Sequence, residues 1–227
     1  HLAVSGLTKF ADDMSATVLA IADINADSEI LVGNELQLLD SSITQLHNLK
    51  GDLPRQQAAE SAAAVLANGG AIAALGVPYS SHVKALGEPL LRNASIPLVG
   101  YRSTASALSD GDLYPHFART CPPDSLQVRA LVDVVNNQSW SRLGILHCED
   151  AYCTGLADDF REQMSAKGVE IDSLKEMELQ RDSSNVMAAV DWLGTTFDDS
   201  CTAEDVTTIM LFLHSDETEA LFAELNK

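Results

Sequence analysis

Residues 71–81, AIAALGVPYSS, decide the fold class of this chain. The first five residues predict a short apolar strand, Gly76-Val77-Pro78 predicts a turn, and Ser80 begins a helical segment that runs to Asn93. An Ala-rich helix, Gln56 to Asn68, comes before the strand and ends at a pair of glycines. Helices that alternate with strands in this way are typical of a parallel sheet covered on both faces.

The same alternation continues along the rest of the chain. Strands are predicted at 35–40, 96–101, 117–120, 143–146, around residue 171 and at 208–213, and helices at 13–25, 124–136, 155–167, 183–193 and from 217 onward. The sequence therefore predicts an α/β fold of parallel sheets flanked by helices. Ligands of such sheets bind at the carboxyl ends of strands, which directs attention to the loops 76–81, 101–104, 148–153 and 214–216.

Composition and charge narrow the class of partner. Fourteen Lys and Arg stand against thirty-three Asp and Glu, so the formal net charge of −19 would repel nucleic acid and anionic membranes. No apolar run approaches the roughly 20 residues of a spanning helix, so membrane attachment would need a segment outside this chain. No dinucleotide, Walker or nucleophile-elbow motif is present, so we predict neither an enzyme nor a cofactor.

Cysteines and sequons favour a secretory route. The four cysteines, Cys121, Cys148, Cys153 and Cys201, allow three pairings, of which one closes the short loop from Cys148 to Cys153. Zinc ligation by these two and His147 would have no recognised spacing, so no metal site is predicted. The sequons at Asn93 and Asn137 predict glycosylation. Together these features indicate an extracellular or cell-surface protein, or a periplasmic one if the source is bacterial.

A set of motifs carries a resemblance to a known family. They are Gly76 to Ser81, Ile96 to Thr104, Leu108 to Asp110, Tyr114 to Thr120, Pro122 to Gln127, Trp140 and Glu149 to Tyr152. In order and spacing they resemble the receptor-family ligand-binding region of class C receptors such as the metabotropic glutamate receptors, of natriuretic peptide receptors and of bacterial leucine-type binding proteins. The likeness to class C receptors is the closest.

The resemblance implies a bilobed fold of the type I periplasmic-binding-protein kind. It predicts lobe 1 at residues 1–121 and lobe 2 at 122–227, with the first crossing near Cys121-Pro122. Such domains are longer than this chain, so we expect the fold to be incomplete on its C-terminal side. The resemblance also implies dimers formed through lobe 1.

Candidate ligand residues follow from the same resemblance. Ser81 matches the serine that binds a ligand carboxylate, and Ser80 or Ser81 could instead cap the following helix. Thr104 matches a threonine that holds the ligand's amino and carboxyl groups, or is a turn residue. Asp124 matches a carboxylate near the ligand amino group and is also a natural N-cap of helix 124–136. Tyr152 matches the lobe 2 aromatic that closes over the ligand, or packs locally.

Arg102 departs from the family pattern, since amino-acid receptors favour a small residue there. A cation at this position could pair with a second acidic group of a ligand or fill the pocket. The loop His214-Ser215-Asp216 falls where relatives often have a further ligand group. We therefore expect a receptor or sensor domain that closes its two lobes on a small polar ligand such as an amino acid. One alternative is a ligand-free interaction module of the same fold. The other is a bacterial solute-binding protein for a transporter, and the two sequons argue against this second alternative.

Overall fold

The structure is a computed structural model that describes residues 2–7, 11–39, 52–169, 173–180, 183–196 and 208–227. It divides into two compact units, His1–Pro122 (unit 1) and Pro123–Lys227 (unit 2), which are described separately. The division falls one residue after the boundary expected from the sequence. Among the described residues, no helix combines the length and the apolar character needed to cross a membrane.

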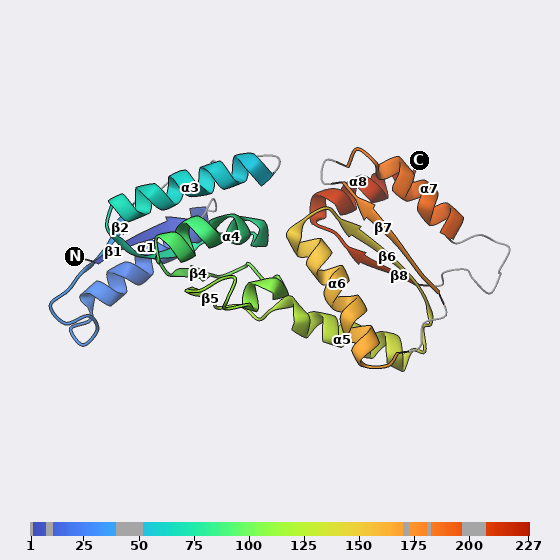
Figure 1. The fold of residues 1–227 in the computed structure, drawn as a ribbon, viewed down its shortest axis with the longest axis horizontal. Helices are drawn as coiled ribbons and strands as arrows, with labels where there is room; N and C mark the ends of the chain where they lie inside the picture. Colours follow the sequence, from blue (N-terminus) through green and yellow to red (C-terminus); the bar gives the residue numbers. More distant parts are fainter. Residues whose placement is uncertain (1, 8–10, 40–51, 170–172, 181–182, 197–207) are drawn as a thin grey trace. The chain divides into compact units, whose positions relative to one another are not determined.

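Unit 1 is built on a five-stranded parallel sheet with the strand order β2-β1-β3-β4-β5 (Figure 1). Its strands are β1 (Leu2–Leu7), β2 (Leu36–Leu39), β3 (Ala71–Gly76), β4 (Leu98–Gly100) and β5 (Phe117–Arg119). Its helices are α1 (Ala11–Ala26), α3 (Asp52–Asn68), α4 (Ser80–Leu86), the π-helix η1 (Gly87–Asn93) and the 3-10 helix η2 (Ser106–Ser109). The core joins α3, α4 and η1 to β3 and β4 through fully buried residues such as Leu66, Leu86, Leu90 and Leu98.

The segment from Ser80 to Asn93 is helical, as the sequence predicted, but it changes type in the middle. The α-helical part ends at Leu86 and a π-helical turn follows from Gly87. Pro89 has no N–H to donate, and its carbonyl accepts from Ala94 five residues later. Gly87 also lies against the ring of Tyr114, where an added Cβ would come within 3.1 Å.

Unit 2 contains a three-stranded parallel sheet with the order β7-β6-β8. Its strands are β6 (Arg142–Cys148), β7 (Ser173–Leu179) and β8 (Thr208–Phe212), and its helices are α5 (Asp124–Asn137), α6 (Ala151–Ala166), α7 (Val186–Thr196) and α8 (Ser215–Leu225). The strand expected around residue 171 is β7, and residue 171 itself lies outside the described residues. Helix α6 begins at Ala151, four residues before the predicted start at Gly155.

The central strand β6 carries two cores, one on each face of the sheet. Leu143 and Ile145 pack with α5 and α6, whereas Leu146 packs with β7, α7 and α8. Alternate residues of a strand point to opposite faces, so a run of apolar residues fills both cores. Figure 1 shows α5 and α6 on one side of this sheet and α7 and α8 on the other.

Sheet order determines which loops become neighbours. In unit 1, β4 pairs with β3, and in unit 2, β8 pairs with β6. Because parallel strands end at the same edge, the loops after β3 and β4 lie together, and so do those after β6 and β8. These are the loops that the sequence singled out.

Candidate functional site

Two hydrogen bonds join the neighbouring loops of unit 1. The buried Ser103 hydroxyl donates to the Val77 carbonyl at 2.6 Å, and the backbone N–H of Ala105 donates to the Ser80 hydroxyl at 3.1 Å. Val77 has a φ of 63°, an uncommon conformation for a β-branched residue. The Ser103 bond to its carbonyl helps to hold this conformation.

A cation braces the second of these loops from the next strand. Arg119, the last residue of β5, donates to the carbonyls of Ala105 at 2.9 Å and Ser103 at 3.3 Å. Its guanidinium also bonds the Ser109 hydroxyl. Five N–H donors in one planar group make Arg suited to gathering several carbonyls. The backbone of residues 103–105 is therefore held by Ser80 and Arg119 together.

The predicted ligand residues of unit 1 have distinct settings in this frame. Ser80 is buried and its hydroxyl binds the neighbouring loop. The Ser81 hydroxyl oxygen is buried and makes no hydrogen bond among the described residues. Thr104 is half-buried and Arg102 is exposed. The alternative role of Ser80 or Ser81 as the cap of α4 is wrong, because the N-cap is Tyr79 and no side-chain capping bond is made there.

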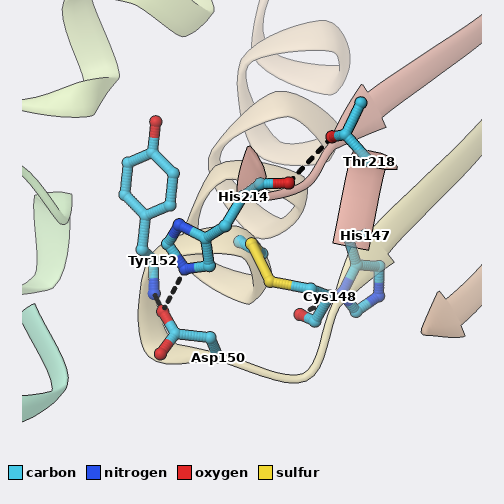
Figure 2. Close-up of a disulfide and its surroundings, with 7 residues drawn as sticks. His147, Cys148, Asp150, Tyr152, His214 and Thr218 are labelled. Carbon is cyan, nitrogen blue, oxygen red and sulfur yellow. Dashed lines mark hydrogen bonds and ion pairs between the residues drawn. A yellow bond between two sulfur atoms is a disulfide. The ribbon is translucent and has the colours of Figure 1, made fainter. Parts of the chain in front are cut away.

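In unit 2, Tyr152 is the centre of a compact group of polar side chains (Figure 2). Asp150 is the N-cap of α6 and accepts the Tyr152 N–H at 2.7 Å. His214, the N-cap of α8, stacks on the Tyr152 ring with centroids 5.3 Å apart and planes 22° apart. Its Nε2 lies 3.5 Å from an Asp150 carboxylate oxygen. Figure 2 shows the two rings side by side above Asp150.

Asp124 approaches Tyr152 from α5, with Gln127 between them. The Gln127 amide donates to Asp124 at 2.7 Å and forms a hydrogen bond with the Tyr152 side chain. Burial raises the pKa of the Tyr152 hydroxyl, the Gln127 bond opposes that rise, and the Asp124 carboxylate adds to it. Asp124 is buried, with 3% of its surface exposed. The prediction that Asp124 is the N-cap of its helix is wrong, since Pro123 is the N-cap and Asp124 begins the first turn.

A disulfide closes the loop that carries Asp150 and Tyr152. It joins Cys148, the last residue of β6, to Cys153 in the first turn of α6, with 5.3 Å between the Cα atoms. This is the local pairing that the sequence left open, and both cysteines are fully buried. Cys121 makes no disulfide with any residue that the structure describes, and Cys201 lies outside those residues.

The histidine that lies next to the disulfide is His214, although His147 is nearer to the two cysteines in the sequence. The two sulfurs and an imidazole nitrogen of His214 all lie within 4.8 Å of one another. His147 turns away: its Nε2 lies 3.1 Å from Glu176 and its Nδ1 lies 3.2 Å from the Cys148 carbonyl oxygen. The strand pairing of β8 with β6 is what brings His214 to this position.

Four residues of these groups were not predicted from the sequence. Ser103, Arg119 and Gln127 lie within the family motifs without a predicted role, and Asp150 was not predicted as a helix cap. An Asp directly before a new helix is the usual cap signal, so Asp150 could have been found. The two sequon asparagines, Asn93 and Asn137, are both exposed at the ends of helices.

Comparison with known proteins assigns the chain to a family. The model of the receptor family ligand binding region matches residues 12–227. Metabotropic glutamate receptor 6 of the rabbit (Oryctolagus cuniculus) is 34% identical over 158 residues, which cover 61% of this chain and 18% of that receptor. Metabotropic glutamate receptor-like protein E of Dictyostelium discoideum is 30% identical over 79 residues, covering 35% of this chain and 10% of that protein.

This chain thus spans less than a fifth of the length of these relatives. The matched family is a receptor ligand-binding region and not a family of enzymes. The predicted α/β fold with parallel sheets flanked by helices is confirmed, and so is the resemblance to class C receptors. The chain belongs to the family of receptor ligand-binding regions.

Proposed function

We propose that this chain is part of an extracellular or cell-surface receptor domain that binds a small polar ligand such as an amino acid. In this proposal Ser81 and Thr104 of unit 1 and Asp124 and Tyr152 of unit 2 contact the ligand. Ser80 supports the loop beside Ser81, and Arg102 selects among ligands. The lobe closure and the lobe 1 dimer that the resemblance implies stay predictions.

The observation that carries the proposal is the side-chain network of Asp124, Gln127 and Tyr152. These residues come from two helices, and Asp124 acts electrostatically on Tyr152 across the shared Gln127. A buried carboxylate next to an aromatic ring attracts an ammonium group by charge and by the negative face of the ring. An amino acid carries such a group.

The loops of unit 1 support the same function. The Ser81 hydroxyl is buried without a hydrogen bond to any described residue. The hydroxyls of Ser80 and Ser103, in contrast, form hydrogen bonds that join the two loops. A buried polar group is usually satisfied, so the Ser81 hydroxyl suits a bond to a ligand. Arg102 is exposed on the same pair of loops and is suited to a second acidic group of the ligand.

Titration calorimetry with a panel of amino acids tests the proposal. We expect at least one of them to bind, Ser81→Ala and Tyr152→Ala to weaken that binding at least tenfold, and Ser165→Ala to leave it unchanged. Ser165 is exposed on α6, far along the helix from Tyr152, and serves as the matched control. Absence of heat with every amino acid would overturn the amino-acid assignment and favour the interaction module.

The secretory assignment has its own test. We propose that Asn93 and Asn137 carry glycans, because both are exposed and lie in sequons. Secretion from a eukaryotic host followed by glycosidase treatment should lower the apparent mass in two steps. Asn93→Gln and Asn137→Gln should each remove one step, and loss of neither step would contradict the assignment.

A further inference from the structure

We propose that the two cysteines of the unit 2 disulfide, Cys148 and Cys153, have a second, reduced state that binds a metal ion together with His214. When the disulfide is reduced, Cys148, Cys153 and His214 bind a divalent cation of the zinc class. The proposal concerns chemistry beside the candidate ligand residues and does not depend on the identity of any ligand.

The donor atoms are already gathered. The two Sγ atoms and an imidazole nitrogen of His214 lie within 4.8 Å of one another. Tetrahedral zinc, with bonds of about 2.0 Å to nitrogen and 2.3 Å to sulfur, separates its donors by about 3.3 to 3.8 Å. Breaking the sulfur–sulfur bond lets the two sulfurs move apart toward that spacing. The three donor atoms therefore already lie close to the spacing that a tetrahedral ion requires.

Three regular elements hold these donors in position. Cys148 ends β6, Cys153 lies in the first turn of α6, and His214 is the N-cap of α8. The His214 carbonyl accepts from the N–H of Thr218 at 3.0 Å and from its hydroxyl at 2.8 Å, which fixes the backbone of the histidine. Sites on helices and strands keep their geometry better than sites on loops.

The surroundings of His214 suit a metal ligand. Asp150 lies 3.5 Å from the His214 Nε2, so it is placed to accept the Nε2–H and orient the ring when Nδ1 is the ligating nitrogen. Both cysteines are fully buried, and the His214 side chain, 26% exposed, is the most accessible of the three proposed ligands. Two thiolates and one imidazole favour zinc over magnesium or calcium, which prefer oxygen.

The conversion balances as a two-electron reduction followed by metal binding. A dithiol reductant breaks the sulfur–sulfur bond, each cysteine gains one electron and one proton, and the reductant becomes a disulfide. The metal then binds the two sulfurs as thiolates, and their two protons leave to solvent. The imidazole binds in its neutral form, and a water molecule completes four coordination.

Cobalt is the probe for the test, because thiolate bonds to Co²⁺ give visible ligand-field and near-ultraviolet charge-transfer bands. The chain carries Cys121→Ala and Cys201→Ala, so that only Cys148 and Cys153 remain as thiols. It is reduced with a dithiol, desalted without oxygen and titrated with Co²⁺, followed by Zn²⁺ competition. We expect one equivalent to bind, the bands to be absent from the oxidised chain, and Zn²⁺ to raise the Tm of the reduced chain.

Two matched variants test the ligand set. His214→Phe keeps a ring to stack on Tyr152 but removes the nitrogens, and it should weaken metal binding at least tenfold. His147→Phe should leave the affinity unchanged. The proposal is overturned if the reduced chain shows no thiolate bands. It is equally overturned if His214→Phe binds as tightly as its parent, or if the reduced chain unfolds and metal does not restore its fold.

Discussion

Units 1 and 2 hold their candidate loops by different chemistry. In unit 1 the loops after β3 and β4 are joined by serine hydroxyls, backbone groups and one guanidinium. In unit 2 the loops after β6 and β8 are joined by a ring stack, a histidine–carboxylate pair and, within the first loop, a disulfide. The strand topology that makes the loops neighbours is the same in both.

This difference separates what each unit responds to. Hydroxyl and backbone groups keep their protonation state across the physiological range, so the unit 1 frame should be insensitive to pH and to reductants. Unit 2 joins its loops with a histidine, a tyrosine, carboxylates and a reducible bond. The raised pKa of Tyr152 makes this candidate site sensitive to alkaline pH, and the disulfide makes it sensitive to reductants.

The largest effect is expected from removal of the disulfide. Cys148→Ala with Cys153→Ala should destabilise unit 2 by about 2 kcal/mol, since a crosslink this short removes modest chain entropy from the unfolded state. The protein has two tryptophans, Trp140 and Trp192, both in unit 2, so urea unfolding followed by tryptophan fluorescence reports this unit. Cys121→Ala is the control and should change that transition by less than about 0.5 kcal/mol. Equal shifts of the urea unfolding transition in the two variants would contradict the stabilisation of unit 2 by its disulfide.

In unit 1, loss of one buried hydrogen bond is the next largest effect. Ser103→Ala leaves the Val77 carbonyl without its side-chain donor and should cost about 1 to 2 kcal/mol. Hydrogen exchange of peptides covering residues 71–105 should show the loss of protection. Ser81→Ala is the matched control, because its hydroxyl bonds no described residue, and it should leave the exchange nearly unchanged. Similar exchange in the two variants would mean that the Ser103 bond does not hold the loops.

Alkaline pH should destabilise unit 2 through Tyr152. Burial, and after it the Asp124 carboxylate, raises the pKa of this phenol above its ordinary value, while the Gln127 bond lowers it. Tyr152 therefore loses its proton at a lower pH in the unfolded chain than in the folded one. The stability that its raised pKa contributes is full below a pH of about 10 and is lost as the pH rises further. Tyr152→Phe should flatten the fall in the tryptophan-detected unfolding free energy. Tyr114→Phe in unit 1 should leave that fall in place, although burial also raises the pKa of Tyr114.

The smallest effect on folding is expected at Arg102. Its side chain is exposed, so Arg102→Ala should change the protection of residues 71–105 by less than about 0.5 kcal/mol. Under the proposed function the same change should weaken acidic ligands more than neutral ones, which calorimetry would measure. A large loss of protection would instead make Arg102 part of the unit 1 frame.

Much of the fold was predictable because its signals are local. The strand and helix order follows from apolar periodicity, and the Gly pair after Asn68 ends α3 as expected. Helix starts were harder. Asp124 has the residue type of a cap, but the preceding Pro123 takes the N-cap position, and α6 begins four residues early because Asp150 caps it. A capping residue type does not specify which backbone position takes the non-helical conformation.

By itself the sequence determined the α/β class, the family and the loops in which polar groups gather, since these depend on residue patterns along the chain. Only the tertiary structure decided which groups meet. Sheet order brought His214 to Tyr152 and the disulfide, and turned His147 toward Glu176. It also gave Ser80 a bond to the next loop and left the Ser81 hydroxyl without one among the described residues. Such contacts depend on which strands are neighbours and on the direction in which each side chain points. The pattern of residues along the chain does not specify either of these for residues that are distant in sequence.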